Sequence, residues 1–349
     1  MSTIDQQTSH LSSAKSCLNN NLNSIDECKP RKLTGKDFIL ERSLGKGSVG
    51  TVLLVRKEWD MELFAMKIMK KRDLQRDQLY ENVVLERHIL QTNKHPFIVH
   101  LKHAFQDQTK LYFVMEYLPG GDLFSLIRKK KCFTSNQTRF YAGEVLLALD
   151  YLHTEMNIIY RDLKPENILI SAEGHLKLSD FGLSKQGEKA YTFAGTPEYL
   201  APEIFLAKGY TRAVDYWSLG ILIYEMLVGK PPFTSENRNI SQIEKLILIN
   251  KPLYPSSLEK DAVDLIHRLL ESNPRKRLQF EEIKNHEFFK GIDWEGLATM
   301  KMEPPIPIDK IRPRKSNKFG EALLRDDDMD ANITFNYLPG ISYNSTIDT

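Results

Sequence analysis

The pattern of apolar residues divides this chain of 349 residues into a strand-rich first part and a helix-rich second part. Short segments rich in Val, Ile, Leu, Phe and Tyr indicate strands between residues 38 and 118, interrupted by one helical pattern at 77–92. After Asp122 the spacing indicates helices. We therefore expect an α+β fold of two lobes, a small β-rich lobe at 37–118 and a larger helical lobe at 119–289. The expected strands are 38–44, 51–57, 62–70, 97–105 and 111–117, and the later helices are 122–130, 135–156, 211–228, 240–249 and 259–271.

The two ends of the chain differ in composition from its centre. Residues 1–36 are rich in Ser, Asn, Gln and Thr and carry few large apolar side chains, which predicts a disordered extension. The stretch 290–349 contains a proline-rich segment, an acidic run and a short apolar patch, and we interpret it as a regulatory tail. A glycine pair at 120–121 falls where the two lobes would join, so we expect a hinge there.

Charge and cysteine content narrow the class of protein. The 48 basic and 46 acidic residues nearly balance, which gives no reason to expect nucleic-acid binding through bulk charge. Three scattered cysteines fit a reducing compartment rather than a disulfide framework. The sequence shows neither a signal peptide nor a run of about 20 apolar residues that could span a membrane. We therefore expect a cytoplasmic protein, with the nucleus as an alternative compartment.

A glycine-rich segment follows the first expected strand. Gly45, Gly47 and Gly50 match the pattern G-x-G-x-x-G-x-V, which ends at Val52. Glycines let backbone N–H groups approach phosphate oxygens without Cβ clashes. The pattern alone is weak, because in dinucleotide-binding folds the glycines open a helix. Here the aliphatic segment 51–55 favours a strand–loop–strand hairpin over phosphates, and an ordinary hairpin is the alternative.

A lysine and a glutamate lie where their charges need partners. In the alternating segment 64–69, Lys67 shares a face with Ala65, whose small side chain would leave room for a flat base. Glu86 lies on the apolar stripe of the helix expected at 77–92, where a charge is costly unless it is paired. We expect Glu86 to pair with Lys67 and to hold it near phosphates. A purely structural ion pair is the alternative.

The strongest local signal is the segment 160–167, Tyr-Arg-Asp-Leu-Lys-Pro-Glu-Asn, which matches H-R-D-L-x-x-x-N with tyrosine in the first place. Asp162 can accept the proton of an attacking hydroxyl, and Lys164 can neutralise charge on a moving phosphate. Asn167 can offer an amide oxygen to Mg²⁺, which prefers oxygen ligands. Asp180 opens an Asp-Phe-Gly triplet thirteen residues later and would be the main carboxylate for the metal.

In this order and at this spacing, the segments resemble a eukaryotic protein kinase. The triplet Ala-Pro-Glu at 201–203 and the segment Asp-Tyr-Trp-Ser-Leu-Gly at 215–220 complete the resemblance, which covers 38–289. By resemblance, Glu203 should pair with Arg277, and the aspartate at 215 should hold the backbone of the loop at 160–167. The resemblance implies an active phosphotransferase that uses ATP and Mg²⁺ and acts as a monomer. A pseudokinase without chemistry and a kinase for small molecules are the alternatives.

Several segments are similar to the AGC group of Ser/Thr kinases. They are Tyr160, the stretch 195–203, the ending His-Glu-Phe-Phe at 286–289 and the tail. Within that group the sequence looks most like the ribosomal-protein and mitogen- or stress-activated kinases, or like the serum-regulated ones. Thr196 and the Lys-Pro pair at 164–165 favour a Ser/Thr acceptor.

The resemblance also assigns the nucleotide pocket. Met115 matches the gatekeeper position, the residues 116–118 match the hinge that binds adenine through its backbone, and Val52 and Leu169 would sandwich the ring. The expected nucleotide contacts are Leu44, Gly45, Lys46, Gly47, Ser48, Val49, Gly50, Thr51, Val52, Ala65, Lys67, Met115, Glu116, Leu118, Asp122 and Leu169.

Three acids match positions that bind basic substrate residues in AGC kinases, namely Asp122, Glu166 and Glu225. Carboxylates suit Arg, because its forked donors can pair with two oxygens at a time. The implied partners are proteins with Arg upstream of a Ser or Thr acceptor, which Thr196 would help to position. Ordinary helix acids are the alternative for Asp122 and Glu225.

Two phosphorylation switches are implied. Thr192 matches the activation-loop site, which an upstream kinase would modify, and Arg161 and Lys185 would receive the phosphate. Relatives often add a histidine from the first-lobe helix at the position of Asn82. In the tail, Leu-Pro-Gly-Ile-Ser-Tyr at 338–343 resembles a hydrophobic motif that docks on the small lobe, with Ser342 as its phosphosite. A solvated acidic run followed by a flexible end is the alternative.

Overall fold

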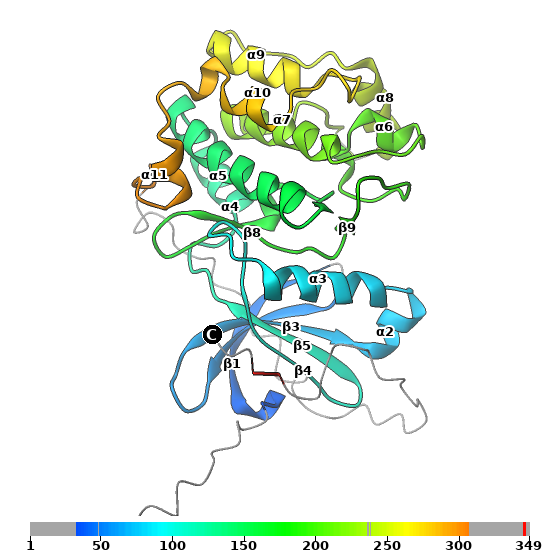
Figure 1. The fold of residues 1–349 in the computed structure, drawn as a ribbon, viewed down its shortest axis with the longest axis vertical. Coiled ribbons are helices and arrows are strands. Elements are labelled where there is room, and N and C mark those ends of the chain that lie inside the picture. Colours follow the sequence, from blue (N-terminus) through cyan, green and yellow to red (C-terminus); the bar gives the residue numbers. More distant parts are fainter. Residues whose placement is uncertain (1–32, 48, 236, 238, 307–344, 347–349) are drawn as a thin grey trace, which may run out of the picture.

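The computed structural model describes residues 33–47, 49–235, 237, 239–306 and 345–346. Figure 1 shows a strand-rich lobe coloured blue to cyan and a helix-rich lobe coloured green to orange. The predicted α+β fold of two lobes is confirmed. Residues 1–32 of the extension expected at 1–36, and the tail motif at 338–343 with Ser342, lie outside the described residues. Residues 33–36 are described, and Leu33 packs on the core of the small lobe.

The small lobe is built on an antiparallel sheet in the order β1-β2-β3-β5-β4-β10. In β3 the expected alternation is present, because Phe64, Met66 and Ile68 enter the small-lobe core while Met69 packs into the larger core. The strands of this sheet are β1 (Phe38–Lys46), β2 (Thr51–Lys57), β3 (Leu63–Lys70), β4 (Leu101–Gln106), β5 (Lys110–Glu116) and β10 (Ser345–Thr346).

The last strand comes from the far end of the chain. In β10, Ser345 pairs with Ala104 and Thr346 pairs with His103, so this short segment extends the sheet at the edge of β4. Figure 1 shows β10 in dark red beside β4. Residues 345–346 therefore lie against the small lobe, where they cover part of an otherwise unpaired strand edge.

The helix expected at 77–92 is α3 (Tyr80–Thr92), and a short helix that was not predicted, α2 (Lys71–Arg76), precedes it. They are separated at Gln78, whose φ of 55° is incompatible with a continuous right-handed helix. The expected start at 77 is therefore wrong by three residues. The apolar stripe of α3 faces inward as predicted, since Val83, Glu86 and Leu90 are each 1% exposed.

The strand expected at 97–105 is only partly correct, because β4 begins at Leu101. The preceding residues pair instead with β8 (Leu176–Leu178) of the large lobe. Leu178 N donates to the carbonyl of Phe97 at 2.8 Å, and Val99 N donates to the carbonyl of Leu178 at 3.0 Å. This segment therefore ties the two lobes together before the chain enters the small-lobe sheet.

The large lobe is mostly helical, and its helices follow the apolar pattern of the sequence. α5 (Ser135–Thr154) begins at a capping box, in which Thr134 and Gln137 satisfy each other's backbone N–H groups. α7 (Ala213–Val228) is almost wholly buried and ends at Gly229, whose φ of 87° stops the helix. The other long helices are α4 (Leu123–Lys130), α8 (Ile240–Ile249) and α9 (Lys260–Leu269).

The pattern did not predict the short helices, since a single turn shows no measurable period. They are α6 (Pro202–Phe205), α10 (Phe280–Lys284) and α11 (Trp294–Ala298). α11 packs on α5, and a Cβ at Gly143 would lie 2.7 Å from Leu297. The first part of the expected tail thus belongs to the packed large lobe. Across the described residues, every helix is too short or too polar to cross a membrane.

Candidate active site

The glycine-rich segment forms the predicted hairpin between β1 and β2. Lys46 pairs with Thr51 across it, and Gly47 N donates to the carbonyl of Gly50 at 3.0 Å. Gly50 has a φ of 102°, and a Cβ there would lie 2.2 Å from the carbonyl oxygen of Ile68. Only glycine fits this position. Because β2 follows the turn and pairs with β1, the glycines do not open a helix. Ser48, at the tip, lies outside the described residues.

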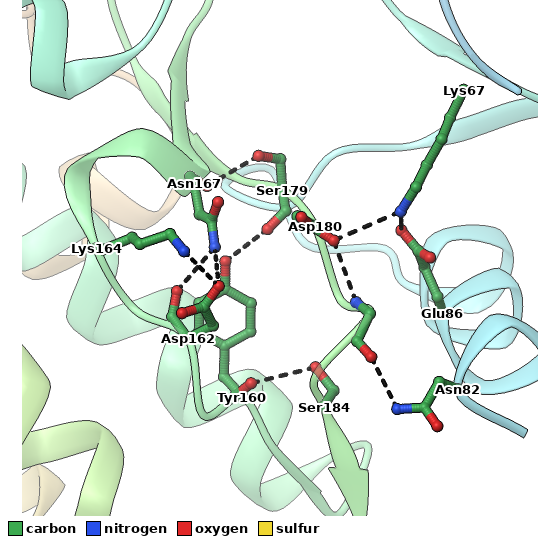
Figure 2. Close-up of polar contacts among 11 residues, drawn as sticks. Lys67, Asn82, Glu86, Tyr160, Asp162, Lys164, Asn167, Ser179, Asp180 and Ser184 are labelled. Carbon is green, nitrogen blue, oxygen red and sulfur yellow. Dashed lines mark hydrogen bonds and ion pairs between the residues drawn. The ribbon is translucent and has the colours of Figure 1, made fainter. Parts of the chain in front are cut away.

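Lys67 and Glu86 form the predicted ion pair between β3 and α3. Lys67 Nζ lies 2.6 Å from Glu86 Oε1 and 3.5 Å from Asp180 Oδ1, as Figure 2 shows. Burial by itself lowers the pKa of Lys67, but the carboxylates of Glu86 and Asp180 outweigh burial and raise it. The lysine is therefore a fixed positive charge, placed between the small lobe and the segment 180–182.

The loop at 160–167 gathers its polar side chains around one carboxylate. Asp162 is 6% exposed, and its Oδ2 accepts from Lys164 Nζ and from Asn167 Nδ2, both at 2.8 Å. Its Oδ1 accepts from the hydroxyl of Thr196 at 2.9 Å, and Lys164 also donates to that hydroxyl at 2.8 Å. The carboxylate thus faces hydroxyl and ammonium groups, which is the environment expected of a base that receives a proton from an alcohol.

Asn167 and Asp180 lie at the same end of a short hairpin. β7 (Ile168–Ile170) pairs with β8 so that Ile168 is opposite Leu178. Ser179 closes this end, since both its backbone N–H and its hydroxyl donate to the carbonyl of Asn167 at 2.9 Å. Asp180 adopts a φ of 51°, a sparsely populated region that often marks functional sites.

The oxygen atoms of Asn167 and Asp180, at this end of the hairpin, are ligands that suit Mg²⁺. The amide nitrogen of Asn167 is turned to Asp162, and Figure 2 shows the amide oxygen pointing away from it. The side chain of Asp180 is 29% exposed, so its carboxylate is accessible. Within the described ranges there is no group of three His, Cys, Asp or Glu side chains that could hold a metal unaided. A magnesium ion held by Asn167 and Asp180 would take its other ligands from water and substrate phosphates.

Comparisons with known proteins agree with this geometry. The model of the protein kinase domain matches residues 38–289. The chain belongs to the protein kinase family. It is 42% identical over 299 residues to the serine/threonine-protein kinase Sgk2 of Homo sapiens, a match that covers 83% of this chain and 81% of that protein.

Two further relatives place this kinase in the AGC group. It is 44% identical over 284 residues to a RAC family serine/threonine-protein kinase homolog of Dictyostelium discoideum, covering 80% of this chain and 63% of the relative. It is 41% identical over 313 residues to the kinase gad8 of Schizosaccharomyces pombe, covering 88% of this chain and 54% of the relative. This kinase thus spans less than two thirds of the length of each of these two proteins.

The residues expected to bind adenine come from both lobes. Ala65 of β3 pairs with Met115 of β5, which brings the expected gatekeeper beside the expected base site. Leu118 is 8% exposed, and Leu169 forms a bridge with Asp122. The other expected contacts lie at the end of β1 or in β2, namely Leu44, Gly45, Lys46, Thr51 and Val52, with Gly47, Val49 and Gly50 in the turn between these strands.

Two anchors that the resemblance implied are present. Asp215 of α7 accepts from Tyr160 N at 2.9 Å and from Arg161 N at 2.8 Å, so it fixes the backbone just before Asp162. Glu203 accepts two hydrogen bonds from Arg277, at 2.7 and 2.9 Å. Both interactions are buried and hold the loops of the site on the helical core.

Thr192 is exposed, and its hydroxyl accepts a hydrogen bond from Arg161 Nη1 at 2.7 Å. Arg161 also donates to Tyr210, whose hydroxyl donates to the carbonyl of Thr192 at 2.6 Å. Lys185 lies exposed in β9 (Lys185–Gln186). The structure thus brings Arg161 to the expected phosphosite.

The three expected substrate acids have different environments. Asp122 caps α4 by accepting from Ser125 N at 2.6 Å, whereas Glu166 is exposed in the turn Pro165–Asn167. Glu225 is 1% exposed and accepts a hydrogen bond from the hydroxyl of Tyr199. Burial raises the pKa of Glu225, and this hydrogen bond only partly opposes the shift. Of the three, Glu166 is therefore the most accessible to a basic substrate.

The sequence did not show two functional contacts. Ser179 donates a hydrogen bond from its hydroxyl to the carbonyl of Asn167. The only signal for this contact in the sequence was the position of Ser179 directly before the Asp-Phe-Gly triplet. Glu116 was expected to bind adenine through its backbone, but its side chain also accepts from Lys177 Nζ at 2.8 and 2.9 Å. A single lysine in a short strand gave no signal for this pairing.

Proposed function

We propose that this chain is an active serine/threonine protein kinase that uses ATP. The observation that carries the proposal is the arrangement of Lys67, Asp162 and Asp180, which are far apart in sequence and face one region between the lobes (Figure 2). Lys67 binds the phosphates, Asp162 accepts the proton of the substrate hydroxyl, and Lys164 neutralises charge on the phosphate in transit. Mg²⁺, held by Asn167 and Asp180, would neutralise the charge of the phosphate oxygens.

The proposal is tested with purified full chain, Mg²⁺, ATP and a serine peptide that carries upstream arginines. The wild type should transfer phosphate to the peptide with a turnover on the order of 1–100 s⁻¹. Asp180→Ala should lose transfer, because a metal ligand is removed. A wild type that binds ATP without transferring phosphate would instead be a pseudokinase, and transfer to a small alcohol but to no peptide would indicate a small-molecule kinase.

The substrates that fit the site best have Arg upstream of the acceptor. The exposed carboxylate of Glu166 and the buried carboxylate of Glu225 influence each other electrostatically, since Glu166 contributes to the raised pKa of Glu225. An arginine bound between them would relieve this repulsion. A positional peptide array should show a gain from upstream Arg that Glu166→Gln reduces. Equal rates with and without upstream Arg would contradict this preference.

Regulation by phosphorylation at Thr192 and in the tail completes the proposal. The contact between Arg161 and Thr192 supports the first switch, because Arg161 adjoins the base Asp162 and would pair more strongly with phosphate than with a hydroxyl. The pairing of β10 with β4 supports docking of the tail on the small lobe. Mapping of phosphosites at Thr192 and Ser342 tests both switches, and unchanged activity after deletion of 333–349 would argue against the second.

A further inference from the structure

Asn82 lies in the first turn of α3 and points toward the Asp-Phe-Gly triplet, as Figure 2 shows. Its amide Nδ2 donates a hydrogen bond to the carbonyl oxygen of Gly182 at 2.8 Å. Glu86 lies one helical turn further on, at i+4, and therefore on the same face of α3. One face of the helix thus makes two contacts with the same polar cluster.

The peptide units around Gly182 are held from both sides. Gly182 is buried, its N–H donates to Asp180 Oδ1 at 3.3 Å, and its carbonyl accepts from Asn82. Within the described part of the chain, the Asn82 amide is the donor found for this carbonyl. A buried carbonyl that loses its donor is costly, so this hydrogen bond stabilises the observed position of α3 relative to the triplet.

Thr192 uses other partners. Its hydroxyl is bound by Arg161 of the loop at 160–167, and its carbonyl is bound by Tyr210 of the large lobe. The Asn82 amide is occupied by Gly182 instead. The link between α3 and the triplet is therefore complete in a chain whose Thr192 carries no phosphate.

We propose that Asn82 is a positioning residue that aligns α3 with the metal-binding triplet independently of phosphate on Thr192. This proposal rests on the proposed kinase function. Lys67, which is paired with Glu86 of α3, has its Nζ 3.5 Å from Asp180 Oδ1. One turn earlier in α3, Asn82 Nδ2 donates to the carbonyl oxygen of Gly182 at 2.8 Å. A helix held at two points one turn apart cannot rotate or slide without breaking one contact. Asn82 thereby fixes the distance between the phosphate-binding lysine and the metal-binding carboxylate.

Two variants at this position separate alignment from folding. Asn82→Asp keeps the shape of the side chain but replaces the donor by a carboxylate that repels the Gly182 carbonyl. A negative charge in the first turn favours the helix itself, so α3 should remain folded. Asn82→Ala removes the donor without adding repulsion and should have the smaller effect. His88→Ala, on the exposed side of the same helix, is the matched control.

Calorimetry on the full chain should compare the binding of Mg·ATP with that of adenosine. Asn82→Asp should weaken the affinity for Mg·ATP about tenfold, which is the upper end of the effect of one lost hydrogen bond, and should change the affinity for adenosine by less than about twofold. Adenosine has no phosphate and does not depend on the position of Lys67 relative to Asp180. The same tenfold loss should appear in a Thr192→Ala background, and His88→Ala should bind both ligands like the wild type.

Three results would overturn the role of Asn82. They are wild-type affinity of Asn82→Asp for Mg·ATP, a parallel loss of adenosine binding, and disappearance of the effect in the Thr192→Ala background. A peptide phosphorylation assay on the same wild-type preparation keeps the two proposals apart. If the wild type transfers no phosphate, the proposed function fails, while the binding comparison still decides whether Asn82 aligns the site.

Discussion

Glu116 and Lys177 form an ion pair between the lobes, with Lys177 Nζ donating to both oxygens of the Glu116 carboxylate at 2.8 and 2.9 Å. Glu116 ends β5 of the small lobe, and Lys177 lies in β8 of the large lobe. The carboxylate also accepts from His100 N at 2.9 Å. This pair lies directly beside the hinge that is expected to bind adenine, so it restrains the lobes where the nucleotide would enter.

Removal of this ion pair should have a small effect on stability. Lys177→Met should lower the free energy of unfolding by about 1 kcal/mol, because the two side chains are partly exposed, at 13% and 22%. The loss should shrink at high salt, which screens the pair. Urea unfolding at two salt concentrations measures both effects, with the exposed Lys189→Met as control. A loss that does not depend on salt would show that the pair acts through packing.

Lys67→Met should abolish phosphate transfer and also destabilise the small lobe. The buried carboxylate of Glu86 would be left without its partner, which costs about 3–5 kcal/mol in comparable buried pairs. The double variant Lys67→Met/Glu86→Leu should recover most of this stability, since an apolar pair can replace a buried ion pair. It should remain inactive. Activity in either variant would contradict the role of Lys67, and an equally unstable double variant would contradict the account of its stability.

Thr192→Ala should lower the activity of kinase that has been treated with its upstream kinase. The variant cannot carry phosphate, so the bond from Arg161 to the activation segment is lost and the segment is held less firmly beside Asp162. A decrease in kcat/KM of roughly tenfold or more is expected, which corresponds to one or more charge-assisted hydrogen bonds. Phosphatase-treated wild type is the control and should resemble the variant. Equal activity of Thr192→Ala and phosphorylated wild type would rule out the switch.

Glu144 should make stability depend on pH near neutrality. It is buried in α5, with Oε1 2.5 Å from His175 Nδ1 and Oε2 accepting from Leu176 N at 2.8 Å. Burial raises the pKa of Glu144 to about 7, above its ordinary value of 4.5, although the hydrogen bonds oppose the shift. A carboxyl group with a raised pKa in the folded state stabilises the fold fully below its unfolded pKa. This contribution is lost as the pH rises through the folded pKa.

The free energy of unfolding of the wild type, relative to Glu144→Gln, should therefore fall by roughly 3 kcal/mol between pH 4.5 and pH 8. Gln keeps the shape of the side chain but does not titrate in this range. Denaturant unfolding of both proteins at several pH values gives the difference. Parallel curves for the two proteins would mean that Glu144 does not change its protonation in this range.

Residues whose roles depend on local pattern could be predicted from the sequence. Glu86 was recognised because a charge on the apolar stripe of a helix needs a partner, and the structure pairs it with Lys67. The loop from Tyr160 to Asn167 was recognised because it matches a catalytic motif, and Asp180 was recognised because it opens an Asp-Phe-Gly triplet thirteen residues later.

Residues whose environment is made by distant segments could not be predicted in the same way. Phe97 and Val99 read as part of a strand, yet they bond to Leu178 of the other lobe. Nothing in the sequence indicated that Glu225 is buried and accepts a hydrogen bond from Tyr199. Both outcomes depend on which side chains the folded lobes bring together.

The sequence by itself determined the two-lobed fold, the kinase family and the candidate residues for the chemistry, because helix and strand periods and motif spacing are local properties of the chain. The tertiary structure decided which contacts align these residues. Asn82 donates to Gly182 because α3 lies against the triplet, and Glu116 meets Lys177 because the lobes close there. Such contacts join residues that are 100 and 61 positions apart, and hydrogen bonds over these separations are set by packing of the whole chain.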